Sequence, residues 1–214
     1  YEKTEDQYMV TDQEYARLER EYDLGLLAEL PPPPEKDFTE TIELFERLIA
    51  EFPDYRDIDG AYYLLGISYL QMEESDKAVD NFHTLVQLYP NSEFAQETWL
   101  RIGEYYFDGA QFELARGAYR RAIEYGDSIW YDKTLFKLGW SNYLLQEFDQ
   151  ALTRFEELLD YYEEKGDRSE QAVREETLQY YAISLAEDDW NLDGLVDDGF
   201  ILPRVENYLG EEKP

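Results

Sequence analysis

Apolar side chains recur three and four positions apart along most of the chain, which is the spacing of one face of an α-helix. Three of these segments align without gaps: AYYLLGISYL from residue 61, TWLRIGEYYF from 98 and TLFKLGWSNY from 134. Each is followed by a polar, turn-prone stretch such as MEES or DGAQ and then by a second periodic segment. The pattern therefore predicts pairs of helices joined by short turns.

The three pairs share small and aromatic residues at fixed positions. A glycine in the first helix is followed by an alanine twelve residues later, an aromatic residue four further on and an apolar residue three beyond that. These residues are Gly66, Ala78, Phe82 and Leu85, then Gly103, Ala115, Tyr119 and Ala122, then Gly139, Ala151, Phe155 and Leu158. Agreement at four positions in three units indicates a genuine internal repeat.

The shared residues predict how the two helices of a unit pack. The glycine and the alanine lie on different helices, and small side chains there let two antiparallel helices approach closely while the aromatic ring fills the space beside them. One helix hairpin cannot bury its own apolar face, so each unit has to stack on its neighbours. We therefore predict an all-α fold of stacked hairpins.

This pattern resembles the tetratricopeptide repeat, a helix-turn-helix unit of about 34 residues. The resemblance rests on Trp99, Gly103, Tyr106, Ala115, Tyr119 and Ala122 in the middle unit, and on Leu65, Gly66, Tyr69, Ala78, Phe82 and Pro90 in the first. The third unit departs from it, with Asn142 in the place of Tyr69 and Tyr106. The resemblance implies a right-handed α-solenoid. The longer linker LYPNSEFAQETW is similar to repeats of bacterial envelope proteins of the outer-membrane assembly and Tol-Pal-associated type, which implies a cell-envelope location.

Partial units flank the three repeats. We expect an N-terminal helical arm at 1–30, a proline-rich spacer at 31–36, a partial leading repeat at 37–58, the three repeats at 59–169, and a final hairpin at 170–214 with an inserted loop. In the arm, Thr11 and Glu14 have capping-box spacing and predict a helix start, and PPPP at 31–34 is expected to end that helix. The arm is either the missing first helix of the leading unit or a segment that packs elsewhere.

The charge and residue composition limit the partners and the kinds of chemistry that are expected. The net charge is −31, from 50 acidic and 19 basic residues, so nucleic acid and anionic membrane surfaces are excluded as partners and basic peptides or divalent cations are favoured. Solubility in a salt-rich habitat explains the charge equally well. No cysteine is present, and no motif for nucleophilic catalysis or phosphate binding occurs. No apolar run is long enough to span a membrane. We predict a protein that is not an enzyme.

In repeats of this kind the stacked first helices line a concave face. The alignment places the following residues there: Tyr63, Ile67, Leu70, Leu100, Glu104, Phe107, Phe136, Trp140 and Tyr143. Such a stripe is either ordinary core packing or a groove for a partner. We predict a groove that binds a peptide or helix with apolar side chains and basic flanks. In the alternative, the protein is a purely structural subunit of an envelope complex whose groove is filled by its own N-terminal helix.

The segment DWNLDGLVDDG, residues 189 to 199, carries oxygen-bearing side chains at alternate positions followed by a glycine. This spacing lets a tightly turning chain point several oxygens at one ion and resembles a calcium-binding loop. The expected ligands are Asp189, Asn191, Asp193, the Leu195 carbonyl and Asp197. Phe200 stands where an EF-hand has its bidentate glutamate. We predict a structural calcium loop at 188–200, against the alternative of an acidic turn in an acidic chain.

Overall fold

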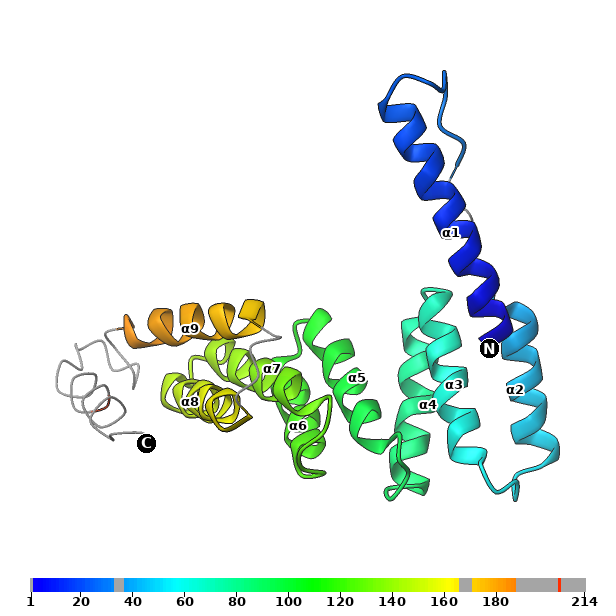
Figure 1. Ribbon diagram of the computed structural model, residues 1–214. Helices are drawn as coiled ribbons and strands as arrows, with labels where there is room; N and C mark the ends of the chain where they lie inside the picture. Colours follow the sequence, from blue (N-terminus) through cyan, green and yellow to red (C-terminus); the bar gives the residue numbers. More distant parts are fainter. Residues whose placement is uncertain (1, 33–36, 166–170, 188–203, 205–214) are drawn as a thin grey trace. The chain divides into compact units, whose positions relative to one another are not determined.

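In the part of the chain that is described, every regular element is an α-helix. The computed structural model describes residues 2–32, 37–165, 171–187 and Arg204 (Figure 1). The helices are α1 Glu2–Asp23, α2 Thr39–Glu51, α3 Ile58–Gln71, α4 Ser75–Leu88, α5 Ala95–Asp108, α6 Phe112–Ile123, α7 Tyr131–Leu144, α8 Phe148–Lys165 and α9 Gln171–Leu185. The predicted fold class, an α-solenoid type built of helix hairpins, is confirmed.

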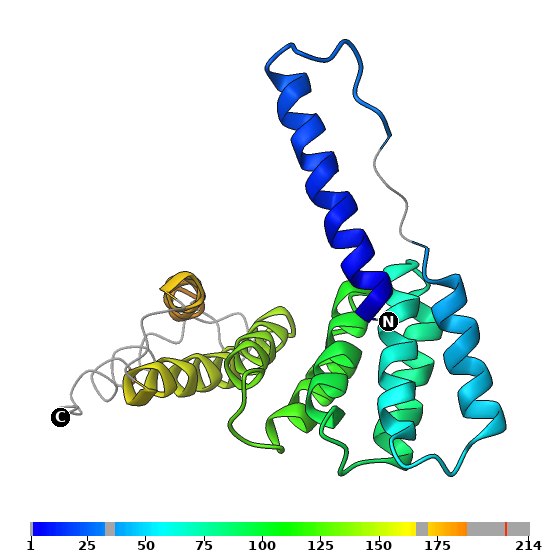
Figure 2. The same ribbon diagram turned by 45° about the vertical axis from the view of Figure 1, so that its right-hand side comes forward.

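The chain divides into two compact units, an N-terminal unit of Tyr1–Thr98 and a C-terminal unit of Trp99–Pro214. The division falls inside α5 and is not visible in the repeat alignment. Within the N-terminal unit, α3 packs against both α2 and α4. Within the C-terminal unit, α7 packs against α6 and α8, and α9 packs against α8 and also contacts α7 (Figures 1 and 2). The consecutive helices named here are therefore neighbours in space within their unit, as stacked hairpins require.

The centre of each hairpin is an aromatic ring that lies directly on a glycine. A methyl group added at Gly139 would place its carbon 2.6 Å from Cε1 of Phe155, and Gly66 and Gly103 are covered just as closely by Phe82 and Tyr119. All three rings are buried, as are the three repeat alanines. The predicted role of the small residues is confirmed, because any larger side chain would force the two helices apart.

The turn inside each hairpin uses a left-handed residue that is not glycine. Glu73, Ala110 and Gln146 have φ angles of 60°, 54° and 61°. In the third hairpin the Gln146 N–H donates to the Tyr143 carbonyl, and the next N–H donates to the Asn142 carbonyl, each at 2.9 Å. This pair of bonds is a Schellman motif, which satisfies carbonyls that the end of a helix leaves open.

The N-terminal helix differs from its prediction at both ends. It begins at Glu2, so Thr11 lies inside the helix and the predicted cap is wrong. It ends at Asp23, where Gly25, with a φ of +71°, permits a Schellman turn in which the Gly25 N–H donates to the Tyr22 carbonyl at 2.8 Å. The prolines at 31–34 therefore do not end it. None of the described side chains from Gln13 to Asp23 is buried.

One core position distinguishes the first hairpin from the third. In the first, the buried Tyr69 donates its hydroxyl hydrogen to a carboxylate oxygen of Glu46 on α2. In the third, the equivalent Asn142 is 1% exposed. Neither its side-chain oxygen nor its nitrogen has a hydrogen-bond partner among the described residues. An unpartnered buried amide destabilises the fold, because folding removes it from water without replacing its hydrogen bonds.

Candidate partner-binding site

Three first helices of the C-terminal unit, α5, α7 and α9, share a run of half-buried aromatic rings. The centroids of Phe107 on α5 and Trp140 on α7 are 5.0 Å apart. Those of Trp140 and Tyr180 on α9 are 5.3 Å apart, and Tyr180 lies 6.3 Å from Tyr143. We call Phe107, Trp140, Tyr143 and Tyr180 the aromatic face. Rings at these distances attract one another, which favours their arrangement on this face.

Tyr143 places a polar group at one end of this face. Its hydroxyl donates to the carboxylate of Glu187 at 3.4 Å. Burial raises the pKa of this hydroxyl above its usual range, and the nearby Glu187 carboxylate raises it further. The phenol is therefore neutral at physiological pH and serves as a hydrogen-bond donor.

Two of the residues predicted for partner binding belong to the core. Leu100 is fully buried beside Ala115, Tyr119 and Leu138. Phe136 is 6% exposed and packs in the core of the α7–α8 hairpin. The expectation that these two face a partner is corrected, because first helices bury one side against their own hairpin and the alignment does not separate that side from the outer one.

The other predicted residues lie on surfaces of the two units. Glu104, Phe107, Trp140 and Tyr143 are half-buried on first helices of the C-terminal unit. Tyr63, Ile67 and Leu70 are half-buried on α3 in the N-terminal unit. The Tyr63 ring stacks on Phe94, with centroids 4.6 Å apart. The structure thus brings Phe107, Trp140 and Tyr143 together.

Sequence reasoning missed two residues of the aromatic face region, Lys137 and Tyr180. The Lys137 ammonium lies 5.0 Å from the Phe107 centroid and 5.1 Å from that of Trp140. Both residues stand two positions before the small residue of their repeat, which is Gly139 in α7 and Ala182 in α9. In both helices this position packs against aromatic residues of the preceding first helix. The position two residues before the small residue of each repeat, read across the alignment, is therefore the sequence signal that could have identified Lys137 and Tyr180.

Ion pairs extend the α5–α7 side of the face. Lys133 Nζ lies 2.6 Å from a Glu104 oxygen, and Arg101 approaches the other oxygen of the same carboxylate at 3.7 Å. The Arg101 guanidinium also lies 5.9 Å from the Trp130 ring centroid. Such half-exposed pairs hold side chains in position more than they stabilise the fold.

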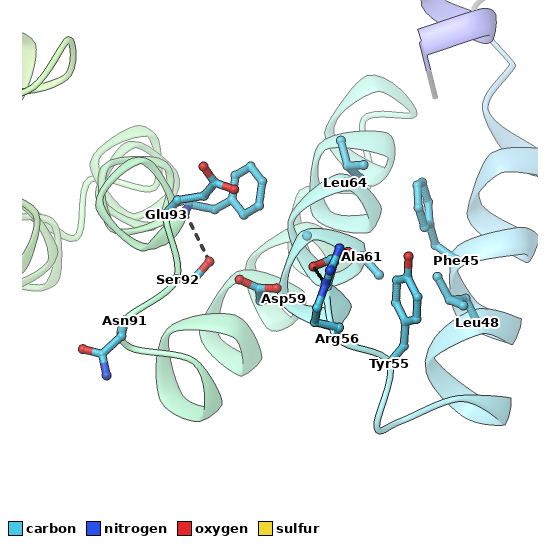
Figure 3. A pocket seen from close by; sticks show the side chains of 13 residues that line it. Phe45, Leu48, Tyr55, Arg56, Asp59, Ala61, Leu64, Asn91, Ser92 and Glu93 are labelled. Carbon is cyan, nitrogen blue, oxygen red and sulfur yellow. Dashed lines mark hydrogen bonds and ion pairs between the residues drawn. The ribbon is translucent and has the colours of Figure 1, made fainter.

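A groove of about 530 Å³ in the N-terminal unit offers a second surface (Figure 3). It is lined on one side by Phe45, Leu48, Tyr55 and Leu64, and on the other by Asp59, Ser92 and Glu93. Arg56 at its mouth is bound to Asp57 by two hydrogen bonds of 2.9 Å, which lower the pKa of that carboxyl. The groove combines an apolar wall with acidic side chains.

The predicted calcium ligands, Asp189, Asn191, Asp193, Leu195 and Asp197, lie outside the described residues. Among the residues that are described, no three acidic, histidine or cysteine side chains are arranged to hold a metal ion. The calcium loop stays a prediction. Within the described helices, none is both long and apolar enough to cross a membrane.

Comparison with known proteins agrees with the hairpin geometry. Residues 133–173 match the tetratricopeptide-repeat family model. Two crystal structures of MamA have a similar fold, each with a TM-score of 0.50. One is 21% identical, covering 70% of this chain and 87% of MamA, and the other is 20% identical, covering 82% and 90%. Residues 133–173 are therefore similar to a tetratricopeptide repeat, and the described helices have the fold of stacked helix hairpins.

Two further matches are to outer membrane proteins of bacteria. Residues 34–125 match the family model YfiO, described as an outer membrane lipoprotein. A relative, the outer membrane protein assembly factor BamD of Pasteurella multocida (strain Pm70), is 32% identical over 37% of this chain and 38% of its own length. The matched part thus spans well under half of that relative. The predicted resemblance to bacterial envelope repeat proteins is confirmed.

Proposed function

We propose that this protein is a non-catalytic scaffold of the bacterial cell envelope that binds a peptide or helix of a partner protein on the aromatic face. The observation that carries the proposal is the continuous contact of rings from Phe107 through Trp140 to Tyr180 and Tyr143. Half-buried aromatic side chains are strong anchors for a partner, because they bury a large area and lose little conformational freedom on binding. The matches to an outer membrane lipoprotein family and to an assembly factor support the envelope setting.

Site-specific photo-crosslinking tests this proposal. A photoreactive amino acid at position 143 is expected to form adducts with a discrete partner protein in envelope fractions, and Trp140→Ala is expected to abolish them. The matched control carries the same probe at Glu113, an exposed position on α6, a second helix. Equal adducts at the two positions, or adducts at 143 that survive Trp140→Ala, would contradict binding at this face.

A second candidate function is a structural subunit whose groove is filled by α1. Its support is that Tyr22, Leu24 and Leu26, at the end of α1 and just beyond, are 44%, 74% and 72% exposed, since exposed apolar residues tend to seek a covering surface. Deletion of residues 1–30 separates the two functions. New dye binding and new peptide binding after the deletion would indicate a plug, whereas unchanged binding favours the open face.

We also propose that residues 188–200 hold a structural calcium ion, with affinity in the weak range of about 0.1 to 1 mM. Thermal unfolding in EDTA and then in millimolar calcium is expected to show a calcium-selective rise in the unfolding midpoint. Asp193→Ala should abolish this rise, and Asp54→Ala, an exposed acidic residue outside the loop, should not. An equal rise with magnesium would return the segment to an ordinary acidic turn.

A further inference from the structure

The side of the aromatic face nearest α5 carries several basic side chains, although the chain as a whole has a net charge of −31. Three basic side chains, Arg101, Lys133 and Lys137, lie on facing surfaces of α5 and α7. Arg101 and Lys133 both bind Glu104. Basic side chains at this face do not fit the expectation, drawn from the net charge, that the partner is basic.

Lys137 differs from its neighbours in what it contacts. Its ammonium lies over the rings of Phe107 and Trp140, at 5.0 and 5.1 Å from their centroids. Within the described part of the chain no carboxylate is paired with it. Lys77 differs from Lys137 in this respect, because its ammonium lies 5.1 Å from the Tyr69 centroid and is also paired with the Glu74 carboxylate. Among the described residues, Lys137 thus contacts two aromatic rings and pairs with no carboxylate.

We propose that the Lys137 region recognises an internal acidic side chain of a partner segment, placed beside an apolar or aromatic side chain of the same segment. The partner's carboxylate would bind the Lys137 ammonium, and its apolar neighbour would pack on Trp140 and Phe107. The rings attract the ammonium, and their apolar surfaces lower the local polarity, which strengthens its attraction to a carboxylate. This inference rests on the proposed function, and it names the chemistry of the partner.

The charge pattern favours this partner over a basic one. A lysine or arginine on the partner would approach Lys137 with like charge, and like charges at close range are unfavourable. The acidic surface elsewhere would still attract basic segments over long distances, but salt weakens that attraction more than a contact on the half-buried face. The contact with Lys137 therefore decides which segment stays bound.

Fluorescence anisotropy with three labelled peptides tests the inference on the full chain. The peptides have acetylated and amidated ends and differ at one position beside a phenylalanine, which carries glutamate, glutamine or lysine. We expect the glutamate peptide to bind most tightly. Lys137→Gln should weaken its binding by roughly three- to tenfold, the range for a half-exposed charge pair. Lys77→Gln, the matched control, should leave it unchanged. Lys137→Glu should invert the preference towards the lysine peptide.

Each other outcome overturns the inference. Tighter binding of the lysine peptide to the unaltered protein would do so, as would a Lys137→Gln protein with undiminished affinity for the glutamate peptide. If the preferred peptide then still requires Trp140, the proposed function stands and only the partner chemistry is wrong. If no peptide binds and Trp140→Ala changes no crosslink, both fail. A further peptide carries the same glutamate but has a free terminal carboxylate. If only this peptide binds, the inference about an internal acidic side chain is overturned.

Discussion

The first hairpin, α3 with α4, and the third, α7 with α8, share one internal design and present different surfaces. In both, an aromatic ring of the second helix lies on a glycine of the first, and the turn between them uses a left-handed residue that is not glycine. Outside that centre they differ. The first has a tyrosine bonded to the preceding helix, whereas the third has a buried amide without a described partner.

The surfaces differ in charge as well. Near the first hairpin, a groove carries Asp59 and Glu93 opposite an apolar wall. On the third hairpin, Lys137 lies over the rings of Phe107 and Trp140. The comparison shows that the contacts within a hairpin fix its geometry, while the outward residues are free to vary. A single repeat design can therefore carry two kinds of binding surface.

The largest expected effect comes from the shared centre. Gly139→Ala and Gly66→Ala should each lower the free energy of unfolding by about 1–3 kcal/mol, because a methyl group there collides with a buried ring. Gly117, exposed on α6 with open space around it, is the control. Gly117→Ala should raise stability by up to about 1 kcal/mol through helix propensity. Urea denaturation measures all three, and a stabilised Gly139→Ala would contradict the close packing.

The next effect distinguishes the two hairpins. Asn142→Leu should stabilise the chain by about 1–2 kcal/mol, because leucine fills a similar volume and removes the unpartnered amide. Tyr69→Leu at the equivalent position should instead destabilise it, since Glu46 loses its donor and the ring leaves a cavity. In thermal unfolding we therefore expect Asn142→Leu to raise the midpoint and Tyr69→Leu to lower it. A destabilised Asn142→Leu would mean that the amide is satisfied in solution.

The smallest effect concerns the turns. Glu73→Gly and Gln146→Gly should each raise stability by about 0.5–1 kcal/mol, because glycine adopts a positive φ without the steric cost of a side chain. The matched control is Gln179→Gly, in the interior of α9 and exposed, which should lower stability by a similar amount. Chemical denaturation at neutral pH resolves the difference, and a loss at position 146 would rule out strain there.

Much of the fold could be predicted because its signals are local. Helical periodicity and the fixed spacing of glycine, alanine and aromatic residues lie within about 20 residues of one another, so the alignment of three units displays them directly. The start of α1 could not be predicted from Thr11 and Glu14, because a capping-box spacing also occurs inside a helix whose earlier residues continue it. The division inside α5 has no local signal at all.

The candidate site was predicted only in part. The alignment identified Phe107, Trp140 and Tyr143, which do lie together, but it also selected Leu100 and Phe136, which are buried in the core. It missed Lys137 and Tyr180, because their role depends on which helix lies against theirs. Neighbouring first helices are about 36 residues apart in sequence, and contacts across that distance follow from stacking.

By itself, the sequence determined the repeat, the all-helical class and the hairpin centres, because small and aromatic residues at fixed spacing admit one close-packed arrangement of two helices. Only the tertiary structure decided which side of each first helix is core and which is surface, and that Lys137 lies over two aromatic rings. The physical reason is that burial and charge pairing are properties of neighbours in space, and a first helix gains those neighbours only when the hairpins stack.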